Sequence, residues 1–266
     1  ELLSIEERNP LITSTYGTGE LIKNALDKGC TKIIIGLGGS ATNDGGIGMI
    51  KALGGLFLDQ YNQEIPDGGA ALSTLHSIDL SGLDKRLQQV AIVCACDVDN
   101  PLTGPSGASY VYAKQKGASD NMLAVLDSNL SNYATVIKAT LNKDLEHISG
   151  TGAAGGTAMG LLAFLDATLT PGIALITELL HLEKHIKEVQ LVVTGEGKID
   201  IQTLHGKTIM GIASLAKKHS IPVLVFTGSI GHGIPEIYDQ GVTAIFSIVS
   251  EPMSLESAIK NASELL

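Results

Sequence analysis

A glycine-rich segment supplies one group of residues that could bind an anion. Gly36-Leu-Gly-Gly-Ser-Ala-Thr-Asn-Asp-Gly-Gly-Ile-Gly48 follows a strand-like run and combines free backbone amides with two hydroxyls and one carboxylate. Backbone amides in such a loop can hold a phosphate or a carboxylate group. The segment therefore predicts an anion-binding loop. Its candidate binding residues are Gly38, Gly39, Ser40, Thr42 and Asn43, with Asp44 as a candidate catalytic acid.

The same segment allows two other interpretations. Gly36, Gly38 and Ala41 fit the dinucleotide fingerprint G-x-G-x-x-G/A, and Asp59 lies about where a ribose-binding acid would follow. In that fold the fingerprint opens the helix itself, whereas Asn43-Asp-Gly-Gly46 delays the helix here. An NAD(P)-dependent oxidoreductase is therefore kept as an alternative, as is a glycine-rich turn that binds no ligand.

A second segment places two carboxylates close together. In Cys96-Asp-Val-Asp-Asn-Pro-Leu-Thr-Gly104, Asp97 and Asp99 follow another strand-like run at positions i and i+2. Carboxylates this close repel each other unless a cation or hydrogen-bond donors lie between them. Magnesium commonly binds through one or two carboxylates together with substrate phosphates. The alternative interpretation is a turn capped by Asn100 and Pro101, with no ligand.

A third segment concentrates charged groups around flexible backbone. Thr194-Gly-Glu-Gly-Lys-Ile-Asp200 and the following Gln-Thr-Leu-His-Gly-Lys-Thr208 are predicted to run from the end of a strand into the start of a helix. Phosphoryl transfer requires cationic side chains that bind phosphate oxygens and acidic side chains that bind a metal ion or a proton. A surface loop with solvated charges is the alternative. The candidate residues are Glu196, Lys198, Asp200, His205 and Lys207.

The elements that would position these segments alternate between strands and helices. Runs rich in β-branched residues predict strands, and apolar residues at helical spacing predict helices over 20–28 and 121–141. Such alternation indicates a parallel sheet with crossover helices, in which ligands gather at the carboxyl ends of the strands. The predicted strands are 32–37, 55–59, 90–96, 190–193, 222–226 and 242–249.

Composition narrows the class of protein. Of the 266 residues 44% are hydrophobic but only 4% aromatic, so the core must be aliphatic, which suits buried parallel strands. A net charge of −10 argues against nucleic acid or an anionic membrane as a partner. The apolar runs are far shorter than the roughly 20 residues that span a bilayer, and no secretory signal is visible. We therefore expect a cytoplasmic protein whose cysteines, Cys30, Cys94 and Cys96, are reduced core residues.

A domain boundary is predicted near residue 170. The Ala/Gly-rich stretch 150–170 ends at Pro171-Gly172, which should break a helix, and a new series of strands and helices follows. The expected domains are therefore 1–170 and 171–266.

Eight motifs follow one another along the chain: Asn9-Pro-Leu11, Thr15-Tyr-Gly-Thr-Gly-Glu20, Gly38 to Gly46, Cys96 to Gly104, Gln115-Lys-Gly117, Gly152-Ala-Ala-Gly-Gly156, Thr194 to Asp200 and Gln202-Thr-Leu-His-Gly-Lys207. Taken together, these motifs resemble the bacterial type (type 1) of glycerate kinase over essentially the whole chain. Members of that family begin with a strand and loops carrying Pro-Asp-Ser-Phe-Lys-like and Asp-Gly-Gly-Glu-Gly-like motifs, which do not occur in this sequence, so we expect this chain to lack that N-terminal segment.

The resemblance implies an ATP- and Mg²⁺-dependent kinase that phosphorylates a hydroxyl of glycerate, with a kinase of another small sugar acid as an alternative. The implied fold is a split Rossmann-like domain, here mainly its C-terminal half at 171–266, with a second α/β domain inserted into it at 1–170 as the substrate-binding domain. Glycerate and ATP are the expected partners, and a homodimer stays open.

Roles for the candidate residues follow on this template. Asp44 is predicted to accept or orient the proton of the substrate hydroxyl, and Asp97 is the second catalytic candidate. Asp99, Lys198 and His205 are predicted to bind substrate or phosphate, Lys207 to act on the polyphosphate as a catalytic residue, and Glu196 and Asp200 to bind Mg²⁺.

Overall fold

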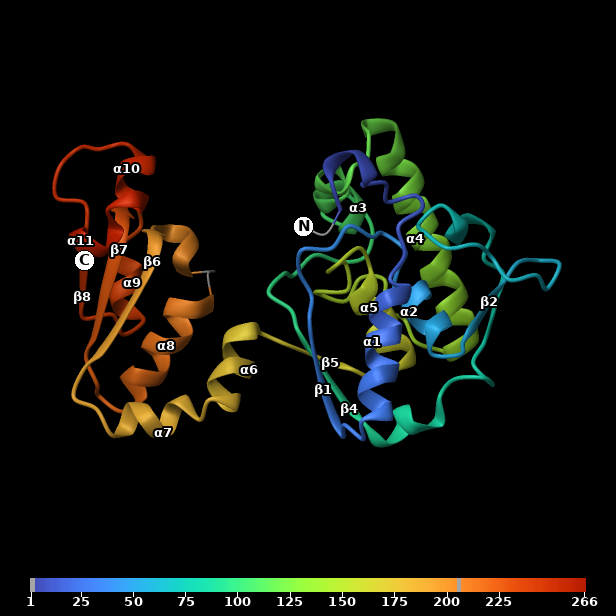
Figure 1. Cartoon of the computed structure of the whole chain (residues 1–266), viewed down its shortest axis with the longest axis horizontal. Coiled ribbons are helices and arrows are strands. Elements are labelled where there is room, and N and C mark those ends of the chain that lie inside the picture. The colour runs from blue at the N-terminus through green and yellow to red at the C-terminus, as the bar shows by residue number, and fades with distance from the viewer. Residues whose placement is uncertain (1–2, 205–206) are drawn as a thin grey trace. The chain divides into compact units, whose positions relative to one another are not determined.

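The computed structural model describes residues 3–204 and 207–266, without the side chains of Gln202 and Lys207. The chain divides into two compact units, Glu1–Thr170 and Pro171–Leu266, called unit 1 and unit 2 below (Figure 1). Each unit contains a three-stranded parallel sheet with helices, which confirms the predicted mixed α/β class. Within the described ranges, no helix has the length and apolar character needed to cross a membrane.

The parallel sheet of unit 1 has the order β1-β4-β5. Strand β1 (Lys32–Gly36) pairs with β4 (Ala91–Ala95), and β4 pairs with β5 (Thr168–Thr170). Alternate residues of β1 are exposed, so one face of this sheet packs on the core while the other meets solvent. The short strand β5 was not predicted from the sequence.

The predicted strand at 55–59 is present but does not join the parallel sheet. Its central residues form β2 (Leu56–Leu58), which pairs in antiparallel fashion with β3 (Ser77–Asp79). Asp59 therefore does not follow a strand that neighbours β1.

The core of unit 1 lies between its sheet and five helices. Phe57, Tyr133 and Phe164 form a buried aromatic group, with Phe57 and Phe164 edge to face at a centroid distance of 5.7 Å. The predicted helices are confirmed with shifted ends. The helices are α1 (Tyr16–Asp27), α2 (Ile47–Ala52), α3 (Ala108–Tyr112), α4 (Asp120–Leu141) and α5 (Thr157–Phe164), with 3₁₀ turns at Ile5–Glu7, Ala71–Thr74, Lys85–Gln89 and Lys114–Lys116.

Unit 2 is built on a second parallel sheet, of order β6-β7-β8. Strand β6 (Val192–Ile199) pairs with β7 (Val223–Ile230), and β7 pairs with β8 (Ala244–Ser247). The main core of unit 2 includes Ile199, Ile209, Ala213 and Val225. The helices are α6 (Gly172–Leu179), α7 (Leu182–Lys187), α8 (Lys207–Lys218), α9 (Pro235–Asp239), α10 (Leu255–Lys260) and α11 (Ala262–Leu265), with a 3₁₀ turn at Ile201–Leu204.

The three cysteines are free thiols, but they do not share one environment. Cys94 and Cys96 are buried, as predicted, and burial raises the pKa of the Cys94 thiol to about 12. Cys30 is exposed, so the prediction of a core position is wrong for this residue. It lies in the turn between α1 and β1, where no strand or helix covers it.

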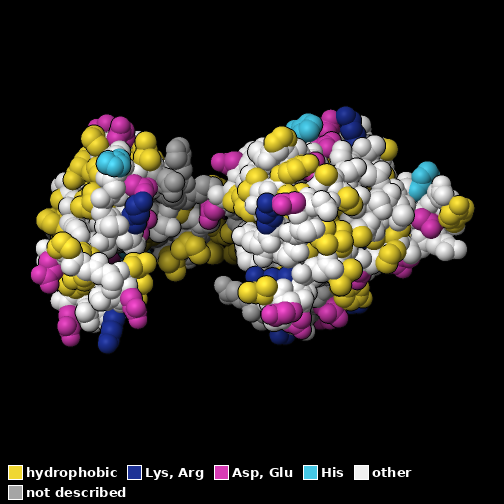
Figure 2. Space-filling view, turned by 90° about the horizontal axis from the view of Figure 1, so that it is seen from above, with side chains coloured by type: hydrophobic (Ala, Val, Ile, Leu, Met, Phe, Trp, Pro, Cys, Tyr) yellow, Lys and Arg dark blue, Asp and Glu magenta, His cyan; other side chains and the backbone are white. Residues whose placement is uncertain are grey.

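Charged side chains are distributed without an evident basic stripe on the face that Figure 2 presents. Lys and Arg side chains lie there singly or in small groups, with Asp and Glu among them (Figure 2). This distribution agrees with the net charge of −10. Nothing on that face points to a phosphate-backbone partner.

Candidate functional site

Two of the three candidate segments lie at the same edge of the unit 1 sheet. Strands β1 and β4 are parallel neighbours, with Gly36 opposite Ala95, and the Leu37 amide continues the ladder to the Ala95 carbonyl at 3.0 Å. The glycine-rich loop that follows β1 and the Asp97–Asp99 turn that follows β4 therefore begin side by side. This carboxyl edge is where parallel sheets bind ligands.

The first part of the glycine-rich loop is open. Gly36, Gly38 and Gly39 are exposed, and a Cβ atom placed on any of them would meet no described atom within 4 Å. Gly39 has a φ of +61°, which favours glycine, whereas packing alone would accept a side chain at Gly36 or Gly38. We call residues 36–40 the loop tip; its backbone is accessible to a small anion.

Asp44 anchors the second part of the loop and is completely buried. One carboxylate oxygen, Oδ2, accepts hydrogen bonds from the Thr15 amide and hydroxyl, both at 2.8 Å, and from the Gly48 amide at 3.4 Å. The other, Oδ1, accepts from the Gly46 amide at 3.1 Å. Burial raises the pKa of Asp44, and these hydrogen bonds oppose the rise. This geometry favours a positioning role for Asp44 over the predicted contact with a substrate hydroxyl.

The residues just before Asp44 are fastened as well. The Ala41 carbonyl accepts from the Thr13 hydroxyl at 2.6 Å, and the Thr42 carbonyl accepts from the Lys116 ammonium at 2.8 Å. The Asn43 side chain is buried and donates to the Ser109 hydroxyl at 3.1 Å, while its Oδ1 has no hydrogen-bond partner among the described residues. We call residues 41–44 the loop root. Among the predicted binding residues, Thr42 and Asn43 thus belong to the root, and Gly38, Gly39 and Ser40 belong to the tip.

Sequence reasoning did not assign a role to Lys116. Its side chain is only 2% exposed, and burial lowers the pKa of its ammonium to about 8, although the Asp44 carboxylate acts in the opposite direction. The motif Gln115-Lys-Gly117 was part of the family resemblance, but a lysine in a turn ordinarily lies in solvent. A glycine at 155 makes room for it, because a Cβ there would lie 2.9 Å from the Lys116 Nζ atom.

The Asp97–Asp99 turn has exposed carboxylates, and hydrogen bonds of the next residue, Asn100, hold its backbone in place. Asp97 and Asp99 are both exposed, and the Ser149 hydroxyl donates to Asp99 at 3.4 Å. Asn100 holds the turn, because its side chain donates to the Ser106 carbonyl at 2.7 Å and accepts from the Tyr112 hydroxyl at 2.6 Å. The turn therefore presents two accessible carboxylates beside the loop tip.

The third segment differs from its prediction, because most of it is strand. Residues 194–199 belong to β6, and parallel pairing with β7 carries the strand through both glycines of Thr194-Gly-Glu-Gly-Lys198. The Thr203 hydroxyl donates to Glu196 at 2.7 Å and accepts from the Asp200 amide at 3.1 Å. Thr203 thus links the two residues that were predicted to bind Mg²⁺.

Lys198 lies against one of these acids. Its ammonium pairs with the Asp200 carboxylate at 2.7 Å, so this cation is close enough to compete with a metal ion at Asp200. Two further predicted residues are not placed by the structure: His205 lies outside the described residues, and for Lys207 only the backbone, at the start of α8, is described.

The fit to a magnesium ion is partial. Among residues 3–204 and 207–266, no three His, Cys, Asp or Glu side chains gather as a metal-binding group. Magnesium bound with nucleotide phosphates commonly needs only one or two protein carboxylates, and Glu196 with Asp200 would satisfy that need. The described residues could therefore contribute one or two carboxylates to an ion that is bound together with phosphate groups.

The β6 segment borders an open hollow. This hollow in unit 2 has a volume of about 1040 Å³ and is mainly apolar. Gly195, Gly197 and Gly228 line this hollow without side chains, together with apolar residues that include Phe226 and Ile259. This lining of backbone and apolar side chains could contact an apolar group.

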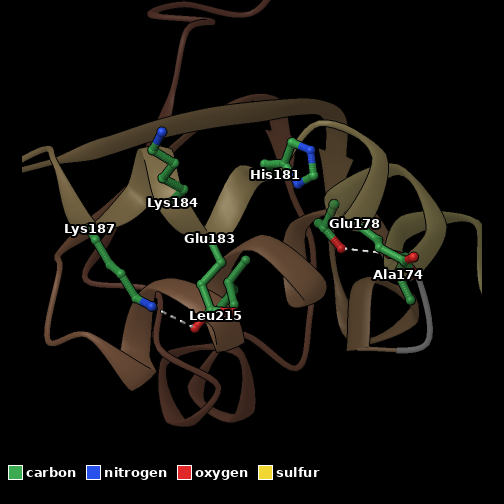
Figure 3. A pocket seen from close by; sticks show the side chains of 8 residues that line it. Ala174, Glu178, His181, Glu183, Lys184, Lys187 and Leu215 are labelled. Atoms are coloured by element: carbon green, nitrogen blue, oxygen red, sulfur yellow. Dashed lines mark hydrogen bonds and ion pairs between the residues drawn. The ribbon is translucent and has the colours of Figure 1, made fainter.

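A second pocket of unit 2 contains none of the predicted site residues. It has a volume of about 530 Å³ and lies among α6, α7 and α8. Figure 3 shows Lys187 reaching Glu183 across its wall, with a nitrogen–oxygen distance of 3.4 Å, while His181 and Lys184 lie elsewhere on its lining. Both acidic and basic side chains line this pocket, so it favours neither an anionic nor a cationic ligand.

The arrangement around β1 does not match a dinucleotide site. In that fold the fingerprint opens the helix after the first strand, whereas here α2 begins at Ile47, well after Gly36, Gly38 and Ala41. Asp59 follows β2, which pairs with β3 outside the parallel sheet. The ribose-binding acid of the alternative hypothesis is therefore not on the strand beside β1.

Comparison with known proteins agrees with the motif pattern. A sequence profile of the Glycerate kinase family matches residues 1–266. The chain is 51% identical to the glycerate kinase of Bacillus subtilis (strain 168), covering 100% of this chain and 69% of the relative, and 49% identical to glycerate 2-kinase of Escherichia coli (strain K12), covering 98% and 69%. It is also similar to a crystal structure of the protein assigned as glycerate kinase 2 from Salmonella typhimurium LT2, with a TM-score of 0.84, 49% identity and coverage of 98% of this chain and 68% of that chain. The chain therefore belongs to the glycerate kinase family.

Proposed function

We propose that this protein transfers the terminal phosphate of ATP to a hydroxyl of glycerate, and that unit 1 binds the glycerate at the carboxyl edge of its sheet. The observation that carries the proposal is the loop tip, whose exposed backbone lies beside the exposed Asp97–Asp99 turn in a chain of the glycerate kinase family. Amides of the tip can bind the carboxylate of glycerate, and a neighbouring Asp can accept or orient the proton of its hydroxyl.

The proposed roles of the acids follow from their exposure. Because Asp44 is buried and Asp97 and Asp99 are exposed, we assign the contact with the substrate hydroxyl to the Asp97–Asp99 turn. Asp44 then acts through the loop that it anchors. A general base in this position should contribute roughly a hundredfold or more to the rate.

Unit 2 is proposed to bind the nucleotide. Lys198 would contact phosphate oxygens, and Glu196 with Asp200 would hold the Mg²⁺ that neutralises phosphate charge when it is bound. Lys207 and His205 stay candidates for the polyphosphate on the strength of the sequence alone.

We further propose that unit 2 is part of a split Rossmann-like domain into which unit 1 is inserted. Support comes from the sheet of unit 2, whose strand β6 is an edge in this chain, and from the apolar side chains that it leaves exposed. The hydrophobic dye ANS should therefore bind the chain, and Ile259→Ser should weaken its fluorescence, whereas an absence of dye binding would contradict an open apolar face. These exposed side chains include Val193, Phe246, Leu255 and Ile259.

The decisive experiment is ADP release from Mg-ATP with and without D- or L-glycerate, with the Bacillus subtilis glycerate kinase as positive control. Release that depends on glycerate supports the proposal. Calorimetry should be run in parallel, because glycerate binding without ADP release would place recognition, but not transfer, in these 266 residues. If neither binding nor release occurs while the control is active, the proposed function is wrong. The Escherichia coli relative is named a 2-kinase, so we expect 2-phosphoglycerate as the product in ³¹P NMR.

A glycine substitution tests the location of the glycerate site. Gly38→Ala adds a methyl group where the protein leaves open space, so folding stability should change by less than about 0.5 kcal/mol. If the tip binds glycerate, the same methyl group should raise the glycerate KM about tenfold while the ATP KM stays constant. Gly17→Ala is the matched control, because Gly17 in α1 also has open space around it. Equal glycerate KM values for the two variants would exclude the tip as the binding site.

A further inference from the structure

The glycine-rich loop has a fastened root and an open tip, and Lys116 is the cation of the root. The ammonium of Lys116 donates to the Thr42 carbonyl at 2.8 Å, three residues from Gly39 in the tip. The side chain is 2% exposed, so it is far more enclosed than lysines usually are. Such enclosure requires compensation, since a buried cation is costly unless it is paired and hydrogen-bonded.

The surrounding chain is built to admit this ammonium. Gly155 lies beside it, where a Cβ atom would come within 2.9 Å of Nζ and 2.1 Å of the Thr42 carbonyl oxygen. The turn that carries Lys116 ends at Gly117, whose φ of +95° and close approach to the Arg8 carbonyl exclude a side chain. Both the ammonium and its backbone are therefore held in place by close contacts that require glycine.

The charge of Lys116 is matched within the loop root. The Asp44 carboxylate favours the protonated form of Lys116, and it is the charged group that acts on this ammonium among the described residues. The two charged groups thus hold adjacent parts of one loop. Lys116 holds the Thr42 carbonyl, and Asp44 accepts from the Gly46 amide at the start of α2. Removing either charge leaves the other buried with its hydrogen bonds alone, that of Lys116 to the Thr42 carbonyl or those that Asp44 accepts.

We propose that Lys116 is a positioning residue for substrate binding: by holding the Thr42 carbonyl it keeps the loop tip in the open conformation that accepts the carboxylate of glycerate. The part of the inference that concerns glycerate rests on the proposed function, whereas the part that concerns the conformation of the loop does not. Because Lys116 is buried at the loop root, it acts by holding the loop and not by contacting the substrate. Its positive charge also favours an anion on the loop above it.

Lys116→Met separates this role from a purely structural one, because Met retains most of the volume and removes the charge and the donor. The matched control is Lys143→Met, since the Lys143 ammonium likewise binds backbone carbonyls, those of Leu162 and Ala163, but away from the loop. Two measurements are compared for both variants: amide hydrogen exchange over residues 36–44, and the KM and dissociation constant for glycerate.

Lys116→Met should accelerate exchange in residues 36–44 and raise the glycerate KM and dissociation constant about tenfold or more, with the ATP KM within about twofold of wild type. Lys116→Arg, which keeps the charge and the donors, should recover part of the loss. Lys143→Met should lower the melting temperature without either effect. Unchanged exchange in residues 36–44 of Lys116→Met, or loss of stability without a change in the glycerate KM, would overturn the inference. If the wild-type chain neither binds nor phosphorylates glycerate, the proposed function fails, and the exchange measurement alone still decides whether Lys116 positions the loop.

Discussion

Asp44→Asn should destabilise unit 1 measurably, because the substitution forces a donor against a donor at a completely buried site. The carboxylate accepts from Thr15 and Gly48 at one oxygen and from Gly46 at the other. An Asn side chain that keeps its oxygen toward Thr15 must point its amide group at the Gly46 amide. One hydrogen bond to a charged group is then lost, and the remaining bonds become neutral.

The expected loss of folding stability in Asp44→Asn follows from these contacts. A hydrogen bond to a charged group contributes about 1.5–3 kcal/mol. The neutral side chain recovers part of this because the Asp44 charge is no longer buried, while the lost attraction to the buried Lys116 ammonium adds to the cost. A net loss of about 2 kcal/mol would lower the melting temperature of a unit of this size by about 4–8 °C. Thermal unfolding followed by circular dichroism measures the shift.

The control is Asp166→Asn. The Asp166 side chain is 89% exposed and pairs with Lys143 at 2.6 Å, so its loss should change stability by less than about 1 kcal/mol. If the two variants melt at the same temperature, the account of Asp44 as a buried anchor is wrong. A normal melting temperature combined with a hundredfold loss of turnover would instead support the role predicted from sequence, in which Asp44 accepts the substrate proton.

Three further predictions concern residues that the structure holds tightly. Burial lowers the pKa of Lys116 to about 8 from an ordinary 10.5, so the unfolded chain binds more protons at this group between these pH values. The free energy of unfolding of the wild type minus that of Lys116→Met, from urea titrations, should therefore rise by up to about 3 kcal/mol from pH 8 to pH 10.5. Other groups, such as Cys94 with its raised pKa, act in both proteins and cancel in this difference. Gly155→Ala should destabilise unit 1 by about 2 kcal/mol or more, because the position has a φ of +68° and a methyl group would collide with the Thr42 carbonyl; calorimetric unfolding matching wild type would refute this. Thr203→Val should raise the KM for ATP several-fold and cost about 1–2 kcal/mol in stability, because Glu196 loses its donor; an unaltered KM would separate this residue from the nucleotide site.

The sequence predicted the parallel strands well where β-branched residues occur in unbroken runs. The run at 32–37 became β1, which ends one residue earlier, and the run at 90–96 became β4, which is one residue shorter at each end. Strand β6 was predicted too short because Gly195 and Gly197 weaken the strand signal, whereas seven paired positions with β7 hold the backbone extended. Pairing partners are long-range information, which local composition does not contain.

The candidate site was predicted at the level of segments more than of side chains. Glycines after a strand were enough to locate the loop tip, but burial of Asp44 depends on Thr15, which lies 29 residues earlier in the chain. The burial of Lys116 depends in the same way on Gly155 and Thr42, which are distant from it in the sequence. A charged residue in a glycine-rich or turn segment is ordinarily exposed, so only the packing of distant segments reveals these two as buried.

The difference in exposure between Cys30 and the two buried cysteines makes Cys30 a site for selective chemical labelling. Thiolates react with maleimides and thiols do not, so the raised pKa and burial of Cys94 protect it, and Cys96 is buried as well. A fluorophore added at neutral pH should therefore attach at Cys30 alone, without any substitution in the chain. Because Cys30 stands just before β1, at the opposite end of that strand from the loop tip, the label would report on unit 1 without obstructing the proposed glycerate site.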